Sequence, residues 1–197
     1  MRRAVLVLVL GLAGCGFGGG EGATIGQDEL PRTVLQPADL PAVFRRFDEG
    51  RQVLADDPGG SRSDRDRFGR RDGWKARFNR PGTAQTSGPL VVESRVDLFE
   101  SSGGAKDDLA AAREDLSNSE LEWQPIDEPG LGDESFAATI VQPGLGEGVR
   151  HYQVFWRDEN VTAFLTANGF EGRVTLEEVL ELARKQEGRI AQAAESS

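Results

Sequence analysis

Apolar and polar residues alternate along four stretches of the chain, and such alternation is typical of strands that bury one face. These stretches are 74–78, 90–99, 151–157 and 161–167. A fifth strand is expected at 135–141, after a segment interrupted by proline and glycine. The polar pair Asp158 and Glu159 separates the last two strands, which predicts a hairpin. The pattern therefore predicts about five strands in a mainly antiparallel sheet.

Two further segments have helical spacing. In the first, Ser102 is the expected cap of a helix whose apolar stripe is Ala105, Leu109, Ala112 and Leu116. The second opens with a capping box from Thr175 to Glu178, and its stripe is Leu176, Val179, Leu180, Ala183 and Ile190. Because each helix has a single apolar stripe, we expect both to cover the same sheet face. The predicted fold class is α+β, a two-layer sandwich with two helices packed on one face of the sheet.

The region before the first strand is predicted to hold a short helix and a loop. In "LQPADLPAVFRRF", Asp39 is the expected cap and Pro41 lies in the first turn. The apolar residues of this helix fall on one face that would dock on the domain, and they are Leu40, Val43, Phe44 and Phe47. Residues 56–72 combine alternating charge with turn-forming residues, which predicts a long surface loop or an extended hairpin tip.

The single cysteine, Cys15, lies in "LAGCG" directly after an apolar run. Arg2 and Arg3 precede this run, residues 4–14, which is too short to cross a bilayer of about 30 Å as a helix. These features resemble the leader and lipobox of bacterial lipoproteins, which implies that Cys15 is acylated and begins the mature chain. The alternative is a buried cysteine after an ordinary signal peptide. It fits less well, because Cys15 stands between the export segment and a glycine-rich run.

Composition divides the chain into a signal peptide at 1–14, a tether at 15–32 and a single α+β domain at 33–197. The tether is expected to be flexible because it is glycine-rich and acidic and has little to bury. The domain is expected to be lipid-anchored on the extracytoplasmic side of the cell membrane, since two acyl chains hold a protein stably to a bilayer. With Cys15 acylated, no disulfide is possible within one chain.

The net charge is −10 for the full sequence. Removal of residues 1–14 takes away two arginines and leaves the mature chain at about −12, which makes nucleic acid a poor partner. Locally the balance reverses, because residues 61–80 hold eight Lys or Arg and three Asp. This run is either an anion-attracting patch, for polyanionic cell wall, phosphate-bearing ligands or an acidic partner, or a solvated loop whose charges pair with one another. The second interpretation is the commoner one for a surface charge run.

Candidate catalytic chemistry is sparse. His151 is the only histidine and is expected to be a partly exposed strand residue, so a multi-histidine metal site cannot form. No GxSxG elbow is present, and the acidic pairs, such as Asp133 with Glu134, match no calcium loop. No catalytic residue, metal or cofactor is therefore predicted. Gly130 and Gly132 flank Leu131 in a loop that either brings backbone N–H groups onto a ligand or is a tight turn into a strand, and the turn is favoured.

The order of elements resembles a class of small actinobacterial-type lipoproteins and extracytoplasmic sensor domains. The resemblance is carried by the lipobox together with "GWKARF", "VESRVDLFES", "EPGLGDES", "YQVFWRDENVTAFLTANG" and "ARKQEGRI". Members of this class are similar to PsbP-like and PknH-sensor-like sandwiches, which implies an extracytoplasmic α+β sandwich and no catalytic motif. The chain lacks the intradomain cysteines that are typical of the PknH-type sensor.

The function expected from these observations is that of a non-catalytic binding or accessory module at the cell envelope. Its partner would be an envelope protein, a lipid or a wall component. The candidate binding residues are those of the basic segment and of an uncovered sheet face, namely Arg65, Arg67, Arg70, Arg71, Trp74 and Trp156. An alternative is a carrier of a small apolar molecule or lipid, with a cavity between sheet and helices lined by Trp123, Phe155, Phe164 or Trp156. An enzyme is the third alternative, and it would depend on His151.

Overall fold

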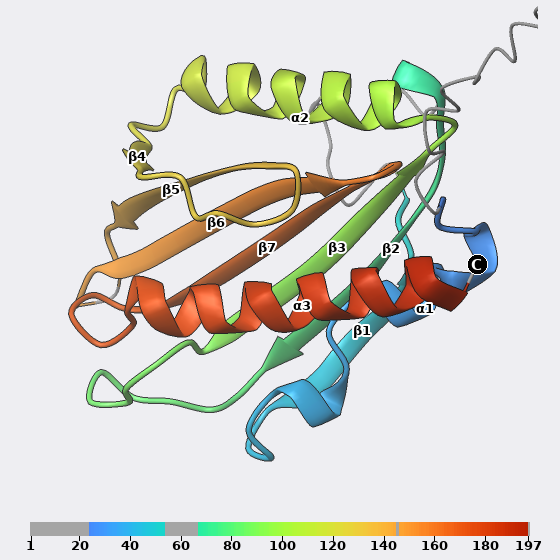
Figure 1. Ribbon diagram of the computed structural model, residues 1–197. Helices are drawn as coiled ribbons and strands as arrows, with labels where there is room; N and C mark the ends of the chain where they lie inside the picture. Colours follow the sequence, from blue (N-terminus) through green and yellow to red (C-terminus); the bar gives the residue numbers. More distant parts are fainter. Residues whose placement is uncertain (1–23, 54–66, 145, 197) are drawn as a thin grey trace, which may run out of the picture.

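Seven antiparallel strands form one open sheet in the computed structural model, which describes residues 24–53, 67–144 and 146–196 (Figure 1). The strand order across the sheet is β1-β2-β3-β7-β6-β5-β4. The strands are β1 Arg45–Arg51, β2 Arg70–Asn79, β3 Val91–Phe99, β4 Gln124–Ile126, β5 Glu134–Gln142, β6 Val149–Asp158 and β7 Val161–Phe170. The predicted α+β class, antiparallel sheet and terminal hairpin are confirmed, while the predicted number of about five strands is wrong.

The two long helices, α2 Ser102–Ser117 and α3 Leu176–Ser196, lie on opposite faces of the sheet, which passes between them in Figure 1. In β6, Val154 and Trp156 join the apolar core under α3. The intervening Phe155 belongs to a second cluster under α2, together with Leu109. Because neighbouring residues of a strand point to opposite faces, the two helices cannot share one face. The expectation that both helices cover the same face is therefore wrong.

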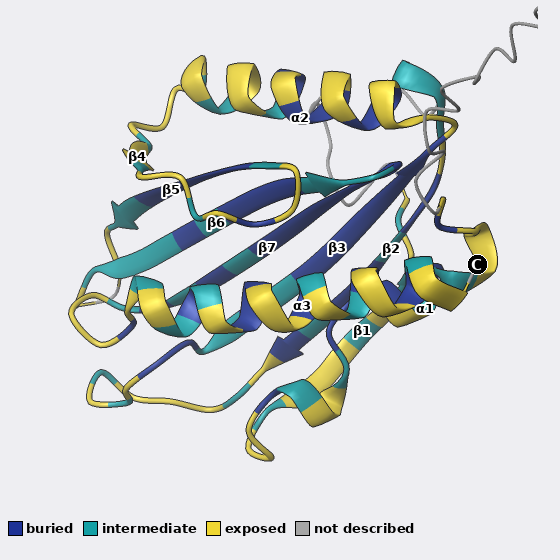
Figure 2. Ribbon diagram, viewed as in Figure 1, coloured by how far each residue is buried: buried dark blue, intermediate teal, exposed yellow. Residues whose placement is uncertain are grey.

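The physical reason is that the sheet carries apolar residues on both faces. Figure 2 shows β3 and β7 buried along most of their length and β6 buried in its middle part, whereas the outward surfaces of the helices are exposed. Each helix does have one apolar stripe as predicted, but a second apolar patch on the sheet accepts the stripe of α2.

Helix capping follows the sequence closely. In α3, Glu178 Oε2 accepts a hydrogen bond from the Thr175 backbone N–H at 2.9 Å, and Thr175 Oγ1 accepts one from the Glu178 N–H at 3.4 Å, so the predicted capping box is confirmed. In α2 the cap is Ser101, whose Oγ accepts from the Gly104 N–H, and not Ser102.

The segment expected to form a helix from Asp39 to Phe47 is instead a short 3-10 turn, η2 Pro37–Asp39, followed by strand β1. Phe47 sits at a register shift of β1 and is 55% exposed, and Val43 is 46% exposed. An edge strand of charged residues is difficult to recognise from its sequence, because one side pairs with the sheet and neither face needs to be apolar.

Part of the predicted tether packs on the domain. The chain from Ile25 forms a 3-10 turn, η1 Gln27–Glu29, and a short helix, α1 Leu30–Thr33, on the same face as α3. Asn160 Oδ1 accepts a hydrogen bond from the Ile25 N–H at 2.9 Å, and both Ile25 and Leu30 are buried. The folded domain therefore begins at least eight residues before the predicted boundary at 33. The predicted leader, Cys15 and the first part of the tether lie outside the described residues.

Candidate functional site

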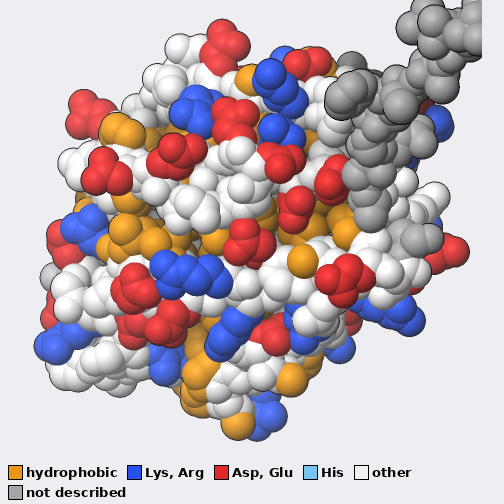
Figure 3. Space-filling model, in the orientation of Figure 1, with side chains coloured by type: hydrophobic (Ala, Val, Ile, Leu, Met, Phe, Trp, Pro, Cys, Tyr) orange, Lys and Arg blue, Asp and Glu red, His pale blue; other side chains and the backbone are white. Residues whose placement is uncertain are grey.

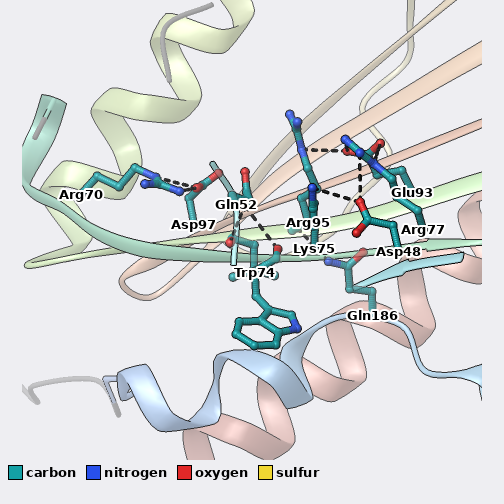
Figure 4. A network of polar contacts seen from close by, with 11 residues as sticks. Asp48, Gln52, Arg70, Trp74, Lys75, Arg77, Glu93, Arg95, Asp97 and Gln186 are labelled. Atoms are coloured by element: carbon teal, nitrogen blue, oxygen red, sulfur yellow. Dashed lines mark hydrogen bonds and ion pairs between the residues drawn. The ribbon is translucent and has the colours of Figure 1, made fainter. Parts of the chain in front are cut away.

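Charged side chains from β1, β2 and β3 form a ladder of ion pairs on the face that α2 covers in part (Figure 4). Asp48 Oδ2 lies 3.0 Å from Lys75 Nζ and 3.1 Å from Arg77 Nη1. Arg77 Nε also contacts Glu93 Oε2 at 2.7 Å, and Glu93 Oε1 lies 3.3 Å from Arg95 Nε. A ligand could use these charges only by displacing their present partners. The ladder is thus better explained as a device that fixes strand register than as a binding site.

A second set of charges on this face, Arg70 and Asp97, also forms an ion pair within the protein. Arg70 Nε and Nη2 both contact Asp97 Oδ1 at 2.6 Å, and the Asp97 side chain is fully buried. Beside it, Gln52 Nε2 donates to the Val96 carbonyl oxygen at 2.9 Å and so ties the segment after β1 to β3. Removal of either charge would break a largely buried ion pair, which is costly.

Further along the same face, three aromatic rings from adjacent strands lie under α2. Phe136 and Phe155 are stacked with centroids 4.5 Å apart, and Phe164 lies 4.5 Å beyond Phe155. A guanidinium group stands over each end of this row, Arg95 at 4.7 Å from the Phe164 centroid and Arg113 at 4.8 Å from that of Phe136. These contacts are favourable because the ring faces carry negative potential.

A pocket of about 280 Å³ opens beside the Phe136 end of this row, between the C-terminal end of α2 and strands β4 and β5. Most of its lining is apolar, and its residues are Arg113, Leu116, Ser117, Trp123, Pro125, Ile126, Phe136, Ala137 and Ala138. An apolar hollow with a single cation at its wall is the arrangement that small-molecule sites commonly have. The pocket offers open space for a ligand, and the ion pair at its wall, between Arg113 and Glu134, is long at 3.5 Å. We name it the α2–β4 pocket.

The described arginines of the predicted basic patch lie in different environments. Arg65 lies outside the described residues. Arg67 is exposed in the 3-10 turn η5 Arg67–Gly69, and its guanidinium lies 4.6 Å from the Phe68 ring centroid. Arg71 is exposed and pairs with Glu100 at 2.6 Å, whereas Arg70 is held by Asp97. The exposed part of the described patch is therefore Arg67 and Arg71.

The tryptophans do not form a surface patch. Trp156 is fully buried in the core under α3. Trp74 is half-buried against the same core, and Figure 4 shows its ring on the side of the strands opposite to Lys75 and Arg95. Of the residues proposed for a carrier cavity, Phe155 and Phe164 belong to the packed aromatic row, while Trp123 lines the α2–β4 pocket.

Sequence reasoning named Leu116 only as part of a helix stripe, and it did not single out Arg113 or the β4 residues of the pocket. Helical spacing places Arg113 on the same side of α2 as Leu109 and Leu116, which was the available signal. The pocket itself depends on β4, a three-residue strand that pairs with β5 and that no pattern in "EWQPID" indicates.

The remaining candidates are His151 and the loop around Leu131. His151 is half-buried in β6, and burial lowers the pKa of its imidazole. Within the described residues, no three His, Cys, Asp or Glu side chains are grouped so that they could hold a metal ion. Gly130 and Gly132 both have positive φ, 68° and 53°, and between them Leu131 is buried in the core, as expected of a tight turn into β5.

Figure 3 shows acidic and basic side chains mixed over the helices on the visible side of the molecule, with apolar side chains between them. No helix in the described part of the chain is both long enough and apolar enough to cross a bilayer.

Comparison with known proteins identifies the fold but no family. None of the protein-family models matches the chain, and no curated protein matches it significantly. Among solved structures the chain is similar to the extracellular domain of PknH from Mycobacterium tuberculosis, with a TM-score of 0.61 and 14% identity over 89% of this chain and 100% of that one. The likeness shows a shared fold, and it agrees with the PknH-type sandwich that the sequence predicted.

Proposed function

We propose that this protein is an extracytoplasmic lipoprotein whose domain binds a partner or ligand at the cell envelope and catalyses no reaction. The observation that carries the proposal is the combination of the lipobox around Cys15 with a fold shared with an extracellular domain. The leader and lipobox direct the chain out of the cytoplasm, and the acyl chains on Cys15 hold it at the membrane.

The anchor also orients the domain. Thr24, where the described chain begins, is nine residues after Cys15, and nine residues span at most about 32 Å in any conformation. The chain then enters the domain at Ile25, which is held by Asn160. Asn160 Nδ2 also donates to the Phe99 carbonyl oxygen, shortly before α2 begins at Ser102. Because the chain enters the domain beside the N-terminal end of α2, we infer that this end lies nearer the membrane on average than the C-terminal end, where the α2–β4 pocket opens.

We consider two surfaces among the described residues as binding surfaces. The exposed arginines Arg67 and Arg71 lie at the membrane-proximal end and offer positive charge to an acidic envelope component. The α2–β4 pocket at the other end favours a second candidate function, that of a carrier or sensor of a small molecule. These two functions make different demands, because the first needs the surface arginines and the second needs the hollow.

Cell fractionation of the full-length chain in its host tests the anchoring. The wild-type protein is expected in the membrane fraction, released by detergent but not by high salt, and accessible to protease added outside the cytoplasmic membrane. The Cys15→Ser variant is expected to lose acylation and to retain its leader. Cytoplasmic protein, or an acylation state that Cys15→Ser does not change, would contradict the proposal.

Cross-linking in intact cells tests the partner surface. We expect the double variant Arg67→Gln, Arg71→Gln to lose its cross-linked envelope partner while keeping its melting temperature. Arg184→Gln, on an exposed arginine of α3 that pairs with Glu177, is the matched control and should behave as wild type. Unchanged cross-linking in the double variant would exclude the two arginines as the partner surface.

A further inference from the structure

The α2–β4 pocket differs from the packed aromatic row beside it in having open space. Phe136 contributes to both, since its ring stacks on Phe155 and the residue also lines the pocket. The other walls are the side chains of Leu116, Trp123 and Ile126. A volume of about 280 Å³ lies near the lower end of the range of small-molecule sites. The occupant is therefore small, with a flat or short apolar body.

Arg113 determines the charge of that occupant. It is the one ionisable residue among the described residues that line the pocket, and its side chain is 50% exposed. Its Nη2 reaches the Ser135 carbonyl oxygen at 3.4 Å and Glu134 Oε1 at 3.5 Å, both long for a charge-assisted hydrogen bond. The guanidinium is thus held over Phe136 by its stacking but is weakly engaged by its present acceptors.

A ligand carboxylate could form an ion pair with Arg113 while Glu134 keeps another cationic neighbour. The second carboxylate oxygen of Glu134 lies 3.8 Å from Arg157 Nε, so the Glu134 charge keeps a cationic neighbour when Arg113 turns to a ligand. The exchange replaces two long contacts by one bidentate pair, which is the geometry that a guanidinium forms best with a planar anion.

We propose that the α2–β4 pocket binds a small amphiphilic anion, with its apolar body between Trp123 and Phe136 and its carboxylate on Arg113. This inference rests on the proposed function of the domain as a binding module and specifies the chemical class of its ligand. A neutral molecule of the same shape forgoes the ion pair, and a cation of that shape is repelled by Arg113.

A matched pair of probes tests the proposal. 1-Naphthylacetate and 1-naphthylacetamide have the same aromatic body and differ in the charge of the head group. Their affinities for the full-length acylated protein in bilayer nanodiscs are measured by isothermal titration calorimetry, with empty nanodiscs as the blank. We expect the carboxylate to bind at least about tenfold more tightly than the amide, as a charge-assisted pair requires.

The Arg113→Gln variant should bring the affinity for the carboxylate down to that for the amide and leave the affinity for the amide unchanged. Arg113→Lys should keep part of the preference for the carboxylate, because the charge persists without the bidentate geometry. Arg184 has the same 50% side-chain exposure on the opposite helix, so Arg184→Gln is the control and should bind both probes as wild type does.

Three outcomes would overturn the inference. They are equal binding of the two probes to wild-type protein, no binding of either, and a preference for the carboxylate that Arg113→Gln leaves intact. None of these outcomes shows whether Cys15 is acylated or the protein is exported. The fractionation experiment tests the proposed function independently. A melting curve of each variant shows that loss of binding is not loss of folding.

Discussion

Arg189 of α3 forms a two-pronged ion pair with Asp39 of the N-terminal segment, with Nε 2.5 Å from Oδ2 and Nη2 2.9 Å from Oδ1. The Gln36 backbone N–H also donates to Asp39 Oδ2, at 2.6 Å. Burial by itself would raise the pKa of Asp39, but the hydrogen bonds from Arg189 and Gln36 and the nearby positive charges lower it below 3.8. This carboxylate therefore joins the segment before β1 to the last helix of the chain.

Asp39→Asn should destabilise the protein at neutral pH by about 1 to 3 kcal/mol, the usual range for a hydrogen-bonded ion pair that is largely shielded from solvent. Arg184→Gln removes an arginine from the same helix whose pair with Glu177 is exposed, and it should cost less than about 1 kcal/mol. Urea unfolding of each variant at pH 7 measures both values. Equal losses in the two variants would mean that the Asp39 pair contributes no more than a surface pair.

The same pair predicts a pH dependence with a definite sign. Because the folded state lowers the pKa of Asp39, its contribution to stability is complete above the ordinary value of 3.8 and is lost as the pH falls through the lower folded value. The difference in unfolding free energy between wild type and Asp39→Asn should thus be constant from pH 7 to about 5 and shrink below 3.8. A difference that grows on acidification would contradict this assignment.

Asp158, at the end of β6, should show the opposite behaviour. Burial raises the pKa of its carboxyl, and the negative charges of Asp133, Glu159 and Glu187 raise it further. The ionised group therefore destabilises the folded state above its raised pKa, and this penalty disappears below 3.8, where the group is protonated in both states. Asp158→Asn should raise the urea midpoint at pH 7 and have no such effect at pH 3.5. Asp127→Asn, at an exposed position, is the control and should shift stability by less than about 0.5 kcal/mol at either pH.

Substitution by alanine should have opposite effects on stability at two adjacent glycines at the start of α2. A Cβ on Gly104 would overlap the backbone carbonyl oxygen of Phe68, whereas one on Gly103 would meet Ser101 Oγ at an ordinary 3.6 Å. Gly104→Ala should therefore cost about 1 to 3 kcal/mol by pushing α2 away from η5. Gly103→Ala should be neutral or stabilising by up to about 1 kcal/mol, because alanine is the better helix former. Thermal unfolding distinguishes them, and a stabilising Gly104→Ala would show that α2 does not pack closely against residue 68.

The elements with strong periodicity could be predicted from the sequence, and those that depend on pairing could not. The β6–β7 hairpin and the α3 capping box depend on residues that are close together in the sequence, so they were predicted with nearly correct bounds. Strand β1 was missed because its charged residues pair with β2 and with one another, which no local pattern shows. The placement of α2 was wrong because Phe136, Phe155 and Phe164 form a second apolar patch only when three strands are aligned.

The candidate site was predictable to a smaller degree. Trp123 was named for a carrier cavity and does line the pocket, but Trp156 was named as well and is fully buried. In a sheet with apolar residues on both faces, alternation shows which residues share a face, but it does not show which part of a face a helix covers. Arg113 looks in the sequence like any solvated helix residue, and its position over Phe136 depends on the crossing of α2 and β5.

The orientation of the domain at the membrane is testable with labels on one helix. Because Cys15 is the only native cysteine, Ser102→Cys and Ser117→Cys each introduce a single free thiol, and both positions are exposed. They lie about 22 Å apart along α2. Energy transfer from a fluorophore at each position to acceptor lipids should be stronger for residue 102. Equal transfer, with the protein still bound to the vesicles, would contradict the orientation and leave the anchoring intact.

The central claim, an acylated binding module of the cell envelope, is tested most directly by native mass spectrometry of the full-length protein taken from its host's membranes in mild detergent. The account predicts a chain that begins at Cys15, carries a covalent mass excess equal to acyl chains, and retains a partner or a small anionic molecule that is released on activation. A bare monomer that keeps residues 1–14 or lacks acyl groups would contradict the account.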